Sequence, residues 1–173
     1  MVWNGQHFLG LEDLSKEDIQ SLIQRASHFL EAGNRYEPNA PLSGKIIANL
    51  FMENSTRTRC SFTIATKRLG GDCIDLLGGT SSASKGETLV DTARNLEAMG
   101  VVGIAVRCSE ESGPSDIAAN VGIPVINAGS GTASHPTQAL LDAGTLLHYF
   151  GCDDLSGQHI AIVGDITHSR VAR

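Results

Sequence analysis

Apolar residues recur at helical spacing near the start of the chain and gather into short runs farther along it. Residues 15–33 repeat apolar side chains three and four positions apart, and Ser15 and Asp18 stand before them in the spacing of a capping box. This pattern predicts an amphipathic helix that ends at Gly33. Its apolar stripe consists of Ile19, Leu22, Ile23, Ala26, Phe29 and Leu30.

A regular alternation of apolar runs and helical segments begins at residue 44. The run GKIIANLFM, residues 44–52, predicts a buried strand, and residues 55–71 predict a helix that Ser55 caps and glycines end. Strands that alternate with helices indicate an α/β fold, in which an open parallel sheet is flanked by helices on both faces. Further strands are predicted at residues 72–77, 101–106 and 123–127, and further helices at residues 87–99, 116–120 and 136–150.

The last part of the chain repeats the beginning of this pattern. Residues 157–170, GQHIAIVGDITHSR, predict the first strand of another α/β unit and a turn after it. We therefore expect residues 1–150 to form one domain and residues 151–173 to be the truncated start of a second. Residues 78–87, GGTSSASKGE, form a long loop whose glycines and serines are typical of a mobile or ligand-binding segment.

Composition and charge narrow the classes of function. With 173 residues, 41% of them hydrophobic, the chain can bury a core, and its net charge of -6 argues against a broad nucleic-acid surface, so any phosphate site must be local. The chain has no signal-like start and no apolar run near the roughly 20 residues of a membrane span, so we expect a soluble, cytoplasmic protein. The spacing of the cysteines matches no zinc site and favours free thiols: Cys60, Cys73, Cys108 and Cys152.

A cluster of hydroxyl and guanidinium groups, residues 55–58 with the sequence STRT, follows the first predicted strand. A loop and helix start after a parallel strand lie at the carboxyl edge of the sheet, where such folds bind ligands. Free backbone N–H groups, the helix dipole and Arg57 would favour a phosphate there. The stretch alone is equally compatible with a Ser55 that only caps the helix and arginines that only face water. The pattern GxxxxGK[ST] is missing, so ATP chemistry is not indicated.

Two later strand ends carry groups of matching chemistry. Arg107 ends the strand at residues 101–106, and a second guanidinium there can hold the same anion, although such an arginine is commonly a surface charge. His135 and Gln138 lie three apart at the start of a helix that Pro136 opens. An imidazole N–H can polarise a carbonyl oxygen and an amide can accept from an NH2 group, while His135 alone could equally be a helix cap. Together the three strand ends predict one site.

The stretches FMENSTRTRCSF, SSASKGET and HPTQALLD together resemble the carbamoyltransferases, whose signature is F-x-[E/K]-x-S-[G/T]-R-T. Glu53 and the lysine of SKGET resemble the aspartate branch of this family more than the ornithine branch. The resemblance extends over the whole carbamoyl-phosphate domain and the opening of the aspartate domain. It implies a homotrimer with shared active sites, in which a long loop reaches the neighbouring subunit.

The resemblance also implies roles for particular residues. His135 and Gln138 would hold the carbamoyl group, and Arg57, Thr58 and His135 would stabilise the developing oxyanion. Lys85 and Arg170 would contact aspartate, with Ser81 and Lys85 contributed to the neighbouring subunit. The residues expected to bind the phosphate are Ser55, Thr56, Arg57, Thr58 and Arg107.

The expected reaction is carbamoyl transfer from carbamoyl phosphate to the amine of L-aspartate, in pyrimidine biosynthesis, with no metal, cofactor or covalent enzyme intermediate. Two alternatives stay open at this point: an ornithine carbamoyltransferase, and a phosphate-binding or assembly fragment that has no activity by itself. Association with a regulatory chain or with a dihydroorotase is also left open by the sequence.

Overall fold

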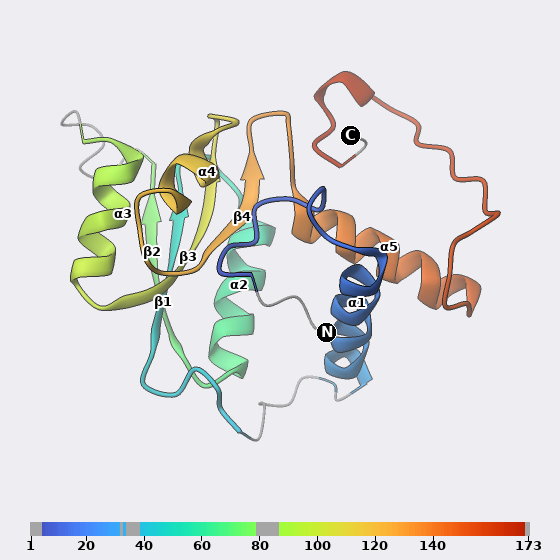
Figure 1. The fold of residues 1–173 in the computed structure, drawn as a ribbon, viewed down its shortest axis with the longest axis horizontal. Helices are drawn as coiled ribbons and strands as arrows, with labels where there is room; N and C mark the ends of the chain where they lie inside the picture. Colours follow the sequence, from blue (N-terminus) through green and yellow to red (C-terminus); the bar gives the residue numbers. More distant parts are fainter. Residues whose placement is uncertain (1–4, 32, 34–38, 79–86, 172–173) are drawn as a thin grey trace.

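One parallel sheet forms the centre of the computed structural model, which describes residues 5–31, 33, 39–78 and 87–171 (Figure 1). Four strands lie in the order β2-β1-β3-β4, so the chain starts near the middle, adds one outer strand and then crosses back. This order and the helices between the strands confirm the expected α/β class. The strands are β1 (Ile46–Phe51), β2 (Asp72–Leu77), β3 (Val101–Cys108) and β4 (Val125–Ser130).

The strand register brings the carboxyl ends of all strands to one edge. Phe51 at the end of β1 lies opposite Leu77 of β2 on one side and opposite Arg107 of β3 on the other. Cys108 of β3 in turn lies opposite Ser130 of β4. Side chains and loops that follow these strand ends are therefore held near one another by the backbone itself.

Alternate residues of β1 face opposite layers of helices. Ala48 and Leu50 pack with the helices α3 (Leu89–Ala98) and α4 (Gly113–Ala118). Phe51 packs on the other face with Phe62 of α2 (Thr56–Arg68). Figure 1 shows these layers on the two sides of the sheet. Since Leu50 is fully buried, its removal from water contributes roughly 2 kcal/mol.

The predicted first helix forms and begins with the predicted cap. α1 (Lys16–Glu31) follows a reciprocal pair in which the Asp18 N–H donates to Ser15 Oγ at 3.1 Å and the Ser15 N–H donates to Asp18 Oδ2 at 3.2 Å. α1 packs against α5 (Pro136–Phe150), yet no residue of α1 is buried and Leu30 remains 67% exposed. The apolar stripe is therefore only partly covered by the described residues.

The segment before α1 contacts the sheet, which the sequence analysis did not predict. Phe8 forms a parallel bridge with Ile126 of β4. The Phe8 N–H donates to the Val125 carbonyl and the Asn127 N–H donates to the Phe8 carbonyl, both at 2.8 Å. This short segment satisfies backbone groups along the outer side of β4.

The strand expected within residues 157–170 is absent from the structure. This segment contains only a short 3-10 turn, η2 (Ile166–His168), and its apolar residues face outward, with Ile162 58% and Val163 94% exposed. Among the described residues no strand lies beside this segment to pair with it. Without a partner, an extended segment would leave its backbone N–H and C=O groups without the hydrogen bonds of a sheet. The segment therefore has the apolar pattern of a strand but no partner strand among the described residues.

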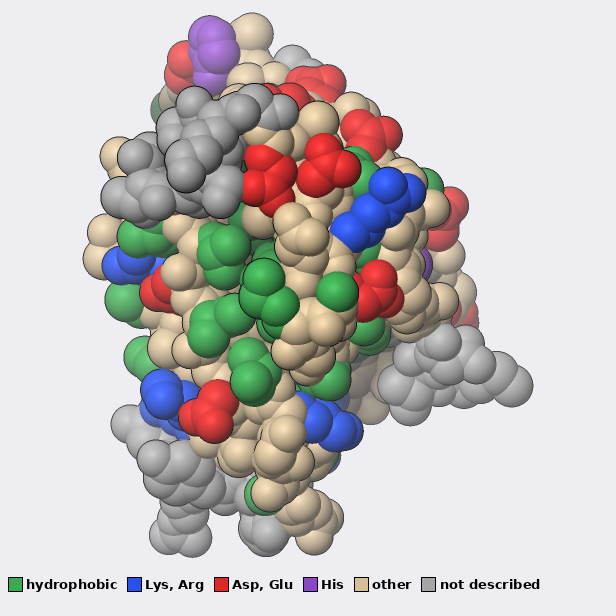
Figure 2. All heavy atoms as spheres, turned by 90° about the vertical axis from the view of Figure 1, so that its left-hand side faces the viewer, with side chains coloured by type: hydrophobic (Ala, Val, Ile, Leu, Met, Phe, Trp, Pro, Cys, Tyr) green, Lys and Arg blue, Asp and Glu red, His purple; other side chains and the backbone are tan. Residues whose placement is uncertain are grey.

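The outer strand β2 lies with α3 on the left-hand side of Figure 1, and this side of the molecule carries an apolar surface. Figure 2 views the molecule from this side and shows apolar side chains gathered between acidic and basic groups. Ile74 of β2 is 39% exposed, although it belongs to a strand. An exposed edge strand is a surface that folded proteins commonly cover.

No helix in the described part of the chain is long and apolar enough to cross a membrane.

Candidate functional site

The start of α2 leaves its polar groups available at the carboxyl edge. Ser55 occupies the N-cap position with an extended backbone, but its hydroxyl makes no capping bond, so the interpretation of Ser55 as a plain side-chain cap is wrong. The first-turn N–H groups of α2 therefore keep their capacity to bind an anion. Arg57 in this turn is exposed, and its side chain has no hydrogen bond or ion pair with another described residue. A hollow of about 130 Å³ lies beside them, lined by Phe51, Glu53, Asn54, Ser55, Thr56, Arg59 and Leu77.

Glu53, just after β1, brings together two arginines that are far apart in the sequence. Arg170 Nη2 donates to both carboxylate oxygens of Glu53, at 3.1 and 2.8 Å. Arg107 Nε lies 3.6 Å from Glu53 Oε2, and Arg107 Nη1 donates to the Ala128 carbonyl at 3.1 Å. One carboxylate thus faces two guanidinium groups, which leaves a net positive charge at the strand ends.

Both guanidinium groups keep a buried nitrogen that is not hydrogen-bonded. Arg107 Nε and Arg170 Nη1 are shielded from solvent and have no hydrogen-bond partner among the described residues. Burial lowers the pKa of Arg107, the neighbouring charge of Arg170 lowers it further, and Glu53 partly opposes both. An arginine stays charged under these conditions, so an added anion would satisfy donors that are costly to leave alone.

The imidazole of His135 lies in the field of the same two arginines. His135 occupies the N-cap position of α5 without a side-chain capping bond, so the alternative that it acts as an ordinary side-chain cap is also wrong. Burial lowers the pKa of His135, and the charges of Arg107 and Arg170 lower it further. The ring is therefore neutral at pH 7, with one N–H to donate and no charge of its own.

The remaining predicted site residues either make contacts other than the predicted ones or fall outside the described residues. Gln138, one turn along α5 from His135, donates from Nε2 to Asp142 Oδ1 at 2.9 Å, so its amide is turned toward its own helix. Ser81 and Lys85 lie outside the described residues. The predicted aspartate contact of Arg170 stays a prediction, because the carboxylate that it contacts here belongs to Glu53.

Two residues near the arginines had no assigned role in the sequence analysis. Glu53 served only to distinguish family branches, whereas in the structure it joins Arg107 to Arg170. Gly129 lies against both guanidinium groups. The sequence shows this residue only as a glycine near the end of a strand. In the sequence, the only signals were an acidic residue just after the first predicted strand and a glycine near the end of the last one. Neither signal indicates which residue it contacts in the fold.

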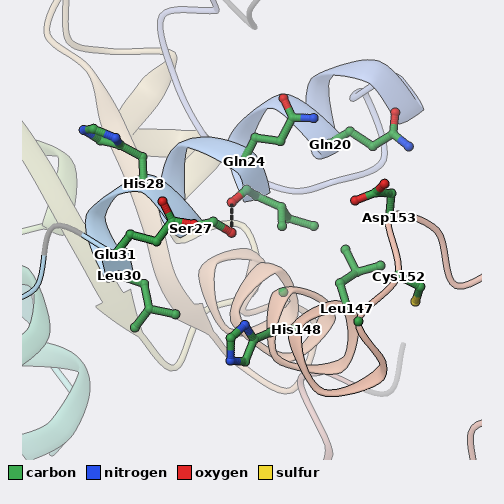
Figure 3. A pocket seen from close by; sticks show the side chains of 13 residues that line it. Gln20, Gln24, Ser27, His28, Leu30, Glu31, Leu147, His148, Cys152 and Asp153 are labelled. Atoms are coloured by element: carbon green, nitrogen blue, oxygen red, sulfur yellow. Dashed lines mark hydrogen bonds between the residues drawn. The ribbon is translucent and has the colours of Figure 1, made fainter.

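A second hollow lies between α1 and α5. The groove has a volume of about 920 Å³, and Figure 3 shows side chains of both helices that line it, among them Leu30 of α1 and Leu147 of α5. Its lining does not include Glu53, Arg107, His135 or Arg170. Among the described residues no group of histidine, cysteine, aspartate and glutamate is arranged to hold a metal ion. The charged edge of the sheet is therefore the candidate site.

Comparisons with known proteins point to one family. Residues 6–148 match the family described as "Aspartate/ornithine carbamoyltransferase, carbamoyl-P binding domain". The aspartate carbamoyltransferase catalytic subunit of Syntrophus aciditrophicus is 49% identical over 174 residues, which cover 100% of this chain and 56% of that relative. The chain thus spans about half the length of the curated relatives that it matches.

Solved structures give the same result. Aspartate transcarbamoylase from Trypanosoma cruzi in complex with carbamoyl phosphate and aspartate superposes with a TM-score of 0.85 and 36% identity, covering 96% of this chain and 51% of that one. Ornithine carbamoyltransferase from Thermus thermophilus gives a TM-score of 0.77 and 32% identity, covering 86% and 50%.

Proposed function

Because this chain belongs to the aspartate/ornithine carbamoyltransferase family, we propose that the full protein transfers the carbamoyl group of carbamoyl phosphate to the amine of L-aspartate. The products are N-carbamoyl-L-aspartate and phosphate, an early reaction of pyrimidine biosynthesis. The observation that carries the proposal is the pair of incompletely bonded guanidinium groups beside a neutral imidazole, all at the carboxyl edge of the sheet. The relatives at 48–49% identity, all named aspartate carbamoyltransferase, favour aspartate as acceptor.

The phosphate of the donor would lie at the start of α2. The hydroxyls of Ser55, Thr56 and Thr58 and the first-turn N–H groups supply neutral donors, and the guanidinium groups of Arg57 and Arg107 supply charge. The absence of a capping bond from Ser55 supports this role, since its hydroxyl is not already used by the helix. Arg57 is likewise uncommitted to other described residues and can turn toward an anion.

The carbamoyl carbon would be attacked by the neutral amine of aspartate. A C–N bond forms, the C–O bond to phosphate breaks, and the proton lost from the amine leaves with the phosphate. Negative charge develops on the former carbonyl oxygen, where His135, Thr58 and Arg57 donate, and one well-placed donor contributes about 3 kcal/mol. A lowered pKa suits His135 to this task, because the ring stays neutral at pH 7 and its weakly acidic N–H can donate to the oxygen without transferring the proton. Gln138 would hold the carbamoyl NH2 after releasing Asp142.

The acceptor would be held by residues from both ends of the site. Arg170 already binds a carboxylate, that of Glu53, and its Nη1 has no hydrogen-bond partner among the described residues, so an aspartate carboxylate can be added beside Glu53. Lys85 would supply a second cation, and we propose that it and Ser81 act in the site of a neighbouring subunit. No cofactor or metal takes part in this scheme.

The proposed assembly is a homotrimer with shared sites in the cytoplasm. The apolar surface at the β2 edge supports contact with a second copy, because exposed edge strands are usually covered (Figure 2). We propose residues 1–150 as the carbamoyl-phosphate domain and residues 151–173 as the start of an aspartate domain, which the exposed Ile162 and Val163 support. A mixture of Lys85→Ala and Arg57→Ala chains should regain activity that neither has alone, and no regain in reassembled trimers would contradict shared sites.

The deciding experiment is an assay of the full-length protein with carbamoyl phosphate and either L-aspartate or L-ornithine. We expect N-carbamoyl-L-aspartate to form and citrulline not to form. Citrulline formation would identify the ornithine branch instead. Calorimetric binding of phosphonoacetate without turnover of either amino acid would leave only phosphate binding.

A further inference from the structure

Asn127 in β4 has a buried amide that is almost fully hydrogen-bonded. The residue is only 2% exposed. Nδ2 donates to the Leu9 carbonyl at 2.9 Å and to Ser130 Oγ at 3.2 Å, while Oδ1 accepts from the Gly129 N–H at 2.8 Å. The side chain thus joins the segment before α1 to the turn that ends β4. A buried amide with these bonds cannot move without leaving polar groups unpaired.

The turn held by Asn127 supports the guanidinium of Arg107. The Ala128 carbonyl accepts from Arg107 Nη1 at 3.1 Å. Gly129 has a φ of +123°, and a Cβ added there would lie 2.7 Å from Arg107 Nη1 and 3.3 Å from Arg170 Nη1. The position therefore needs a glycine for its backbone conformation and for the space that the guanidinium groups occupy.

We propose that Asn127 is a positioning residue, whose amide fixes the turn at Ala128 and Gly129 so that the Arg107 guanidinium faces the anion site. It touches no substrate itself and acts through Arg107. Its part in catalysis rests on the proposed function, but its effect on the place of Arg107 does not. A residue that only stabilised β4 would leave the surroundings of His135 unchanged once the protein was folded.

The imidazole of His135 reports the place of Arg107 independently of activity. Arg107 and Arg170 lower the pKa of His135, and Asp142 raises it. In an Asn127→Ala variant the turn loosens, and Arg107 spends less time near the imidazole. NMR titration, with the His135 signal assigned by a His135→Gln variant, should show a higher His135 pKa in Asn127→Ala than in the wild type. An unchanged titration in the folded variant would overturn the proposal.

A pair of glycine variants tests the same turn if Asn127→Ala does not fold. Gly129→Ala adds a Cβ against both guanidinium groups. Gly100→Ala is the matched control, because Gly100 has a comparable φ of +93° and open space around its Cβ position. Both variants carry similar backbone strain, but only the first displaces an arginine. Equal effects of the two substitutions on ligand affinity would contradict the proposal.

Calorimetry with phosphonoacetate supplies the second measurement, on the full-length protein. We expect the affinity to fall about tenfold in Asn127→Ala and in Gly129→Ala, as for one weakened charged hydrogen bond, and to stay unchanged in Gly100→Ala. A wild type that does not bind the probe would refute the proposed function, and the NMR titration would still decide the role of Asn127. Wild-type binding together with normal affinity in Asn127→Ala would refute the positioning role alone.

Discussion

The carboxyl edge of the sheet and the α1–α5 pair are two parts of one chain that differ in how completely they are packed. In the sheet, Leu50 is fully buried and even the polar Asn49 and Asn127 lie at 0% and 2% exposure with hydrogen-bond partners. In the helix pair, no residue of α1 is buried and Tyr149 of α5 is 81% exposed. The sheet buries most of its apolar side chains, although Asn49 Oδ1 and Arg107 Nε lie buried without a hydrogen-bond partner among the described residues, whereas the helix pair leaves large apolar side chains exposed.

This difference separates what fixes the site from what surrounds it. The strand register places Glu53, Arg107 and His135 at one edge without help from α1 or from the segment after α5. Arg170 is the exception, because it reaches the edge from the exposed segment through its bonds to Glu53. The proposed donor half of the site is therefore set by the sheet, and the proposed acceptor half depends on the less packed part of the chain.

The largest expected effect separates function from packing at the edge. Arg57→Ala should lower kcat/KM for carbamoyl transfer by about 10²–10³-fold, the usual loss of one oxyanion donor, while the free energy of unfolding changes little, because Arg57 is exposed. Lys67→Ala, a cation in the last turn of the same helix, is the matched control. Steady-state kinetics and urea unfolding on the same preparations decide, and near-wild-type kinetics of Arg57→Ala would remove Arg57 from the mechanism.

A pair of leucines tests the packing contrast directly. Leu50→Ala in β1 should lower the free energy of unfolding by about 3 kcal/mol, since it removes a fully buried side chain and leaves a cavity. Leu30→Ala in α1 should change it by about 0.5 kcal/mol or less, because Leu30 is 67% exposed. Urea denaturation measures both values. Comparable losses in the full-length protein would show that another surface covers α1 there.

The sequence predicted the strands of the sheet and the helices α1 and α5, but it failed at residues 157–163, and one physical reason explains both outcomes. Periodicity reports which face of an element is apolar, and along β1, β3 and β4 the neighbouring helices cover those faces. The apolar run at residues 157–163 has the same pattern but no strand beside it among the described residues, so it forms no strand. An apolar run with this pattern forms a strand only when a partner strand lies beside it.

The site shows a similar division. The convergence of Arg107 and His135 on one edge follows from parallel strands and could be predicted from the alternation alone. The bond between Glu53 and Arg170 joins residues 117 positions apart, and the contact of Gly129 with Arg107 depends on a backbone angle. Neither has a local sequence signal. Ser55 shows the reverse case, since a residue suited to capping does not cap.

Two helix starts provide a smaller test of that last point. At α3 the Asp91 N–H donates to Thr88 Oγ1 at 3.1 Å, whereas the Ser55 hydroxyl makes no such bond at α2. Thr88→Ala should therefore lower the free energy of unfolding by about 1 kcal/mol, and Ser55→Ala should leave it nearly unchanged. Ser55→Ala should instead raise the KM for carbamoyl phosphate. A stability loss at Ser55 as large as that at Thr88 would indicate that Ser55 caps α2 in solution.

The smallest expected effect is a change of slope with pH. Burial and the charges of Arg107 and Arg170 hold the pKa of His135 below its ordinary value of 6.5, so below that pH the unfolded chain binds more protons than the folded protein. The free energy of unfolding should therefore fall as pH decreases through 6.5 and be insensitive to His135 above it. His135→Gln removes this contribution, so the variant should gain stability relative to the wild type between about pH 7 and pH 5. Urea unfolding across this range measures the difference, and a constant difference would mean that the ring is not held in the arginine field that the packed edge of the sheet creates.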